Sequence, residues 1–231
     1  SPTQLRLEAG QWWRYSLASS HAALGSEGLD LNGSVEVRCY ALLPEGGYLL
    51  GERYVLESAS AEHRALAEQS SRELLLEVDR QGQLKRLALP ETTPDARNML
   101  RALVISRQVV LPSEPSQRWQ AFGEDTTGRF VAEYRTEGEQ VVRSRAYESL
   151  HGTASEGALI SIRGELGGLL HADGRPQSWA GEEVIRVGAP SLKGAVSDSL
   201  SVRSRYAYAL VAEGRFDDPQ SVLASAEGQL G

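Results

Sequence analysis

Apolar and polar residues alternate in short runs along most of this chain, and this period of two constrains the fold more than any other feature. In segment 35–40, for example, Val35, Val37 and Cys39 alternate with polar or half-polar neighbours. Turn-forming sequences such as 79–82 (Asp-Arg-Gln-Gly) separate many of these runs. The pattern predicts a mainly β protein made of antiparallel hairpins.

Roughly a dozen short strands follow from this pattern. Because exposed strand edges promote aggregation, so many strands favour a closed or nearly closed antiparallel β-barrel. The predicted strands cover residues 12–17, 35–40, 48–57, 72–78, 83–89, 129–136, 140–150, 158–165, 168–172, 179–187 and 201–211.

One segment has a helical period instead. Residues 92–95 (Thr-Thr-Pro-Asp) combine a threonine cap, proline in the first turn and an acid favoured by the helix dipole. Pro112 ends the helix, which we expect over about 94–111. Its apolar face needs a sheet to cover it, so we predict one central helix that plugs the barrel. That face carries Leu100, Leu103 and Val104.

The chain has 231 residues, a length that one large β domain can reach. We predict a single barrel domain over residues 1–216. Residues 217–231 are rich in Ser, Ala, Gly and Gln and are expected to form a flexible tail or a linker, although a short helix over 220–227 is an alternative.

Charge and cysteine content exclude several classes of function. The net charge of −7 argues against a nucleic-acid partner, because binding to phosphates needs a basic face. Cys39 is the only cysteine, which excludes an internal disulfide, and its place in the alternation predicts a buried strand position. No apolar run is long enough for a transmembrane helix.

No group of residues points to catalysis, a metal or a cofactor, so we expect none of them. The four histidines have no metal-ligand spacing, and the chain lacks a Gly-x-Ser-x-Gly nucleophile motif. The glycine-rich segment 164–168 is expected to be a strand turn or bulge. The acid pairs 182–183 and 217–218 are read as solvated strand and loop positions. The histidines are His21, His63, His151 and His171.

Four arginines are the only candidate binding residues. Arg143 and Arg145 alternate on one predicted strand, as do Arg203 and Arg205 on another. The simpler interpretation is a solvated outer face of the barrel. The functional alternative is a patch that binds an acidic protein segment or a lipid headgroup.

The order of strand, turn, helix and strand resembles a known family. Residues 74–84 form an apolar strand and a glycine turn, 94–104 and 108–111 a helix that ends in an apolar-Gln step, and 124–134 an acid, a glycine and an aromatic-x-x-x-Tyr strand. The opening Gly10–Tyr15 segment is also similar. Together they resemble the N-terminal barrel of the large lipid-transfer proteins (vitellogenin, apolipoprotein B and the microsomal triglyceride transfer protein).

This resemblance implies an antiparallel barrel around a helix, with a role in recognising receptors and protein partners. In that family the main lipid cavity is formed largely by later domains that this chain does not contain, and the barrel usually has paired cysteines, whereas this chain has one.

We therefore expect a non-catalytic recognition domain that docks a protein partner or a following domain of the same chain. The alternative is a carrier that binds a lipid or another apolar ligand between sheet and helix. The bias toward Ala, Arg, Leu and Gly favours a bacterial source. We expect an extracytoplasmic protein (periplasmic, outer-membrane-associated as a lipoprotein, or secreted).

Overall fold

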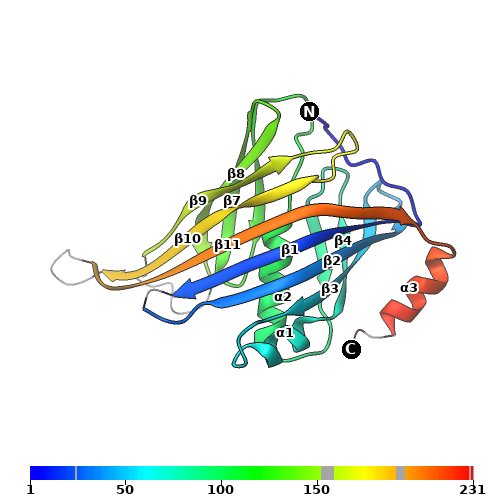
Figure 1. The fold of residues 1–231 in the computed structure, drawn as a ribbon. Helices are drawn as coiled ribbons and strands as arrows, with labels where there is room; N and C mark the ends of the chain where they lie inside the picture. Colours follow the sequence, from blue (N-terminus) through cyan, green and yellow to red (C-terminus); the bar gives the residue numbers. More distant parts are fainter. Residues whose placement is uncertain (24, 152–158, 191–195, 229, 231) are drawn as a thin grey trace.

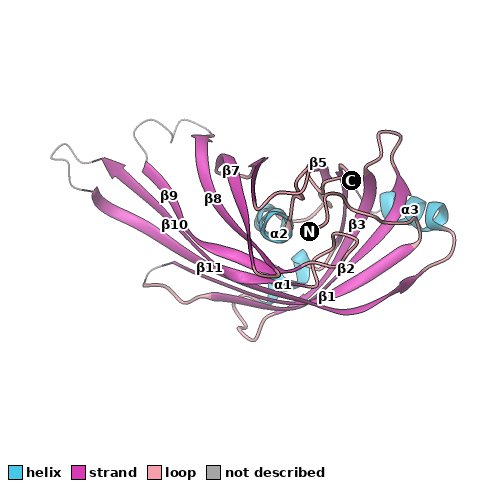
Figure 2. Ribbon diagram, turned by 90° about the horizontal axis from the view of Figure 1, so that it is seen from above, coloured by secondary structure: helices cyan, strands magenta, loops and turns pink. Residues whose placement is uncertain are grey.

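A computed structural model describes residues 1–23, 25–151, 159–190, 196–228 and 230. The strands form one antiparallel sheet in the order β5-β4-β3-β2-β1-β11-β10-β9-β8-β7-β6, and it curves into a nearly closed barrel (Figures 1 and 2). The protein is thus mainly β, as predicted. The strands are β1 (Gln11–Ala23), β2 (Leu29–Leu42), β3 (Tyr48–Glu57), β4 (Glu73–Val78), β5 (Leu84–Ala88), β6 (Arg118–Glu124), β7 (Gly128–Glu137), β8 (Gln140–Leu150), β9 (Leu159–Leu169), β10 (Ser178–Pro190) and β11 (Val196–Arg215).

Three helices accompany the sheet: α1 (Arg64–Ser70), α2 (Pro94–Arg107) and α3 (Pro219–Glu227). Helix α2 lies on the concave side of the sheet (Figure 2), where Leu100, Leu103 and Val104 are buried. The helix ends four residues earlier than the predicted position 111, because residues 108–111 continue in an extended conformation toward the β4–β5 turn. There the Leu111 amide donates to the Gln81 carbonyl at 2.7 Å.

The inward faces of the strands form the main core together with α2. On β1, for example, Trp13, Tyr15 and Leu17 are buried in alternation with exposed neighbours. Cys39 is fully buried on β2, as its place in the alternation predicted. Period-two patterning therefore placed the inward faces of these strands correctly.

The structure corrects the prediction at β9. Two strands were expected over 158–165 and 168–172, with a turn or bulge between them, but a single strand runs from Leu159 to Leu169 without a register shift; Ala158 lies outside the described residues. Gly164 has φ +101°, and a Cβ there would lie 2.1 Å from the Glu182 carbonyl oxygen. Glycine is thus needed at this position for a close strand pairing and not for a turn.

Helix α3 also differs from the expected flexible tail. Asp218 adopts a left-handed conformation and accepts a hydrogen bond from the Ser221 amide at 3.3 Å, so it begins the helix. Ala226 is buried against a small outer cluster that contains Tyr40 and Leu75. Residues 219–227 are therefore attached to the convex side of the sheet.

Candidate functional site

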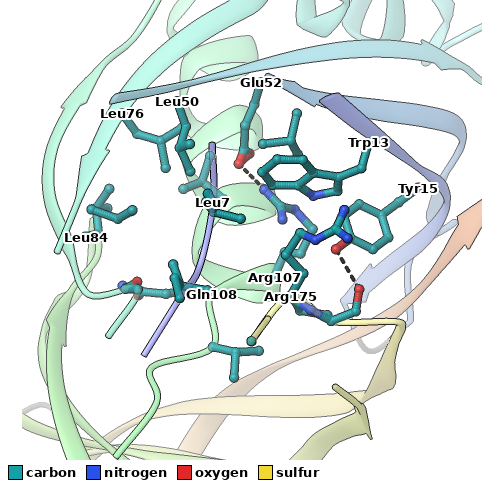
Figure 3. Close-up of a pocket in the computed structure, with 18 residues that line it drawn as sticks. Leu7, Trp13, Tyr15, Leu50, Glu52, Leu76, Leu84, Arg107, Gln108 and Arg175 are labelled. Atoms are coloured by element: carbon teal, nitrogen blue, oxygen red, sulfur yellow. Dashed lines mark hydrogen bonds and ion pairs between the residues drawn. The ribbon is translucent and has the colours of Figure 1, made fainter. Parts of the chain in front are cut away.

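A mainly apolar hollow lies at the C-terminal end of α2, and we call it the end cavity (Figure 3). It is bounded by α2, by the N-terminal segment and by the inward faces of β1 to β5. Its volume is about 80 Å³. Pockets that bind drug-sized molecules are usually about 300–1,000 Å³. The apolar wall is formed mainly by Leu5, Leu7, Leu50, Leu76, Leu84 and Val109.

A buried ion pair closes one side of the end cavity. Glu52 on β3 is 1% exposed and pairs with Arg107, the last residue of α2. The Tyr54 hydroxyl donates to Glu52 Oε1 at 2.8 Å. Burial alone would lower the pKa of Arg107, but Glu52 and the surrounding tyrosines together outweigh it and raise that pKa. The Glu52 carboxylate is therefore neutralised by a fixed partner and is not a free catalytic base.

A second arginine closes the other side. Arg175 binds Asp173 at 2.8 Å and Glu213 at 3.0 Å, and its guanidinium lies 5.1 Å from the centre of the Trp13 ring. The Tyr15 hydroxyl beside it donates to the Pro176 carbonyl at 2.7 Å. Burial raises the pKa of Tyr15 to about 12, so the phenol stays neutral at physiological pH.

The opposite side of α2 faces a second network of buried charges. Arg145 on β8 donates to Glu183 on β10 at 2.8 Å and lies 3.4 Å from Asp125. Arg143 donates to the carbonyls of Ile105 at 2.9 Å and Gln108 at 2.8 Å, at the C-terminal end of α2. Arg143 thus adds a charged donor to the carbonyls at the end of the helix and complements the helix dipole.

Next to this network lies a side cavity of about 280 Å³ between α2 and strands β1, β8, β10 and β11. Met99, Ile105 and Ile185 contribute apolar surface to it. The polar contributors include His21, whose Nδ1 lies 2.9 Å from the Ser204 hydroxyl. Burial lowers the pKa of His21 to about 4, so its ring is neutral at pH 7. The side cavity therefore combines apolar surface, a neutral histidine and charged residues such as Asp125 and Arg145.

The four candidate arginines do not form one patch, which corrects the sequence interpretation. Arg143 and Arg145 are 2% and 9% exposed and face the barrel interior, so neither the solvated face nor the binding patch is possible for them. Arg203 and Arg205 are exposed and pair with Glu182 at 3.3 and 2.5 Å. Whether they bind a partner stays a prediction.

Glu183 also departs from its predicted solvated position, because it is 3% exposed and pairs with Arg145. Sequence reasoning gave no role to Glu52 either. The alternation of Leu50, Glu52 and Tyr54 is the signal that places this carboxylate inside. An inward acid in turn requires a cation, which Arg107 supplies from the apolar side of α2.

Within the described ranges, no cluster of three or more His, Cys, Asp or Glu side chains has the geometry to hold a metal ion. The helices described here are all too short and too polar to cross a membrane.

The described residues define a class by their fold and interior: a nearly closed, eleven-stranded antiparallel β-barrel with buried arginine–carboxylate pairs, one of which joins the sheet to a helix. A solved structure with a similar fold is that of lipovitellin, described for its lipid–protein interactions, with a TM-score of 0.62 and 14% sequence identity. The match covers 92% of this chain and 26% of the lipovitellin chain, so this chain spans about a quarter of that length. Neither a family model nor a curated protein matches the sequence. The likeness supports a lipovitellin-like fold for this chain.

Proposed function

We propose that this chain is a non-catalytic recognition domain of a lipid-transport-type protein, which docks a protein partner or a neighbouring domain of its own chain in an extracytoplasmic compartment. The observation that supports the proposal is how α2 is held against the sheet, which we take to make it a plug. Its C-terminal end is bound to β3 through Arg107 and Glu52 and to β8 through Arg143. The end cavity beside these contacts is too small for an acyl chain and its headgroup.

The chemistry of the interior also favours recognition over catalysis. The buried carboxylates Glu52 and Glu183 are both paired with arginines. A general acid or base must reach a substrate, and these two carboxylates are 1% and 3% exposed and face their arginines. A rigid interior leaves the outer strands, edges and loops as the surfaces available for binding.

A crosslinking survey with the purified domain tests this proposal. We expect a partner whose crosslinks are lost when excess unlabelled domain is added and which binds again when both components are purified. If no partner passes the competition step, the recognition role is wrong.

A second candidate function is a carrier, and the side cavity of about 280 Å³ favours it because its volume is close to the lower limit for ligand pockets. Native mass spectrometry and solvent extraction of the purified domain separate the two candidates. A carrier would retain an apolar molecule and would release a fluorescent fatty acyl probe when lipid is added. An empty domain that never takes up the probe would exclude the carrier function.

A further inference from the structure

The barrel has one seam, between the free edges of β5 and β6. Ten antiparallel pairings connect these two strands through the sheet, so β5 and β6 run in the same direction. Direct closure would require a parallel pair in an otherwise antiparallel sheet. One additional strand between them would be antiparallel to both edges and would close the barrel with a single type of pairing.

The seam has open space along its length. A hollow of about 310 Å³ is lined by β5 residues such as Leu84 and Leu87 and by β6 residues such as Phe122 and Gly123, with Ile105 of α2 beneath. A second hollow of about 610 Å³ lies between β5, the segment 110–116 and β6. Both edges thus border the same groove.

The two edges differ in how they are protected. Natural edge strands avoid unwanted pairing through lysines, prolines and bulges. β5 has Lys85, Arg86 and a bulge in its pairing with β4. β6 pairs with β7 without any register shift, has no lysine or proline, and carries Phe122 at 59% exposure. β6 therefore has the features of an edge that is covered by a partner.

Two hydrogen bonds determine which backbone groups of β6 face the seam. The Asp125 amide donates to Gly128, and the Thr136 amide donates to Gln117, so the odd-numbered residues from 117 to 125 bond to β7. The backbone N–H and C=O groups of the even-numbered residues therefore point toward the seam. Of these groups, the amide and carbonyl of Arg118 are already bonded to the Ser116 hydroxyl. In the described part of the chain no such bond is made by the seam-facing groups of Gln120, Phe122 and Glu124.

We propose that β6 binds an extended segment of another protein as a twelfth strand, antiparallel to β6 and β5. The side chains of β6 define the chemistry of that segment. Its inward residues lie next to Trp119, Ala121 and Gly123 and are apolar. Its outward residues are an apolar one opposite Phe122, a base opposite Glu124 and an acid opposite Arg118. Glu124 also contacts His151 at 2.8 Å on the exposed surface.

This inference rests on the proposed recognition role and names the surface that performs it. A fluorescent peptide with the sequence Lys-Val-Phe-Val-Thr-Val-Glu is the probe, because its ends complement Glu124 and Arg118 in the antiparallel orientation only. A peptide with the terminal Lys and Glu exchanged is the matched control. Fluorescence anisotropy is expected to show binding of the first peptide and about three- to tenfold weaker binding of the second, since cross-strand charge pairs contribute about 0.2–1 kcal/mol each.

Two variants test the geometry. The double variant Arg118→Glu with Glu124→Lys is expected to reverse the preference between the two peptides. Gln120→Pro removes one seam-facing amide and is expected to weaken binding at least about tenfold, whereas Gln120→Ala leaves it unchanged. Proline is tolerated at such an edge position, and circular dichroism shows whether the variant folds.

The proposal is overturned if neither peptide binds, if the double variant keeps the original preference, or if Gln120→Pro and a folded Gln120→Ala bind equally. It is also overturned in favour of a second copy of this chain if sedimentation shows a dimer that Gln120→Pro dissociates. If crosslinking finds a partner that contacts another surface, the seam proposal is wrong and the recognition role stands. If the peptide binds but no protein partner is found, β6 accepts a strand and the recognition role is wrong.

Discussion

Buried arginines connect α2 to the sheet at the level of single residues. Arg143 donates three hydrogen bonds to the carbonyls of Ile105, Ser106 and Gln108 and lies 3.6 Å from Glu183. An apolar replacement would remove these three charge-assisted hydrogen bonds to the end of α2 and leave part of the Glu183 charge uncompensated. Such a loss in a buried network costs more than the loss of any surface pair.

We expect Arg143→Met to lower the free energy of unfolding by about 3–5 kcal/mol, as measured by urea denaturation. Arg205→Met is the matched control, because its ion pair with Glu182 is exposed and is expected to cost less than about 1 kcal/mol. Equal costs for the two variants would mean that the interior network does not hold the helix in place.

His21 gives the protein a specific pH dependence. Its pKa is lowered to about 4 by burial, against about 6.5 in an unfolded chain. The unfolded state therefore binds more protons between these values, so the contribution of His21 is fully present above about pH 6.5 and is lost as the pH falls toward 4. His21→Asn, which can still bond to Ser204, should show a smaller loss of stability over this range in denaturation at each pH. An identical pH profile would assign the loss to other groups.

At the level of elements, α2 shows how local chemistry starts a helix and tertiary contacts end it. Thr93 caps its first turn by accepting from the Ala96 amide at 3.4 Å, as the Thr-Pro-Asp sequence predicted. The end of the helix was placed at Pro112, but the chain leaves the helix after Arg107. Arg107 pairs with Glu52, and Arg143 takes the final carbonyls, so contacts far apart in sequence determine the last turn.

Removal of the cap is a test at this scale. Thr93→Ala is expected to destabilise the protein by about 1 kcal/mol, because it leaves an amide of the first turn without a partner and also removes the hydrogen bond to Gln69. Thr93→Ser keeps the hydroxyl and is expected to retain most of the stability in thermal denaturation. If serine and alanine are equally destabilising, the methyl group rather than the cap is responsible.

Elements without a clear period were missed. α1 is only seven residues long, and β6 contains Gly123 between Phe122 and Glu124, which weakens the strand pattern. Hairpins with strong turn signals were placed well: β3 and β8 begin and end at the predicted residues. Short segments depend on their neighbours for stability, so their sequences alone say little about them.

At the level of the whole molecule, the open seam should be visible in hydrogen exchange. The seam-facing amides of Gln120, Phe122 and Glu124 are expected to exchange faster than those of Ala121 and Gly123, which bond to β7. β1, which is paired on both sides, is expected to exchange slowly along its centre. Equal protection of neighbouring β6 amides would show that the outer edge is already covered in the isolated chain.

The sequence alone predicted the mainly β class, most strands, the start of α2 and the burial of Cys39, because alternation, turns and caps act over a few residues. It did not predict which charged side chains lie inside the barrel. A period of two separates two faces of a strand but does not say which face the sheet curves around, so Arg143 and Arg203 looked alike. The curvature and order of eleven strands place Arg143 against the end of α2, expose Arg203 to solvent and leave β6 at the free edge.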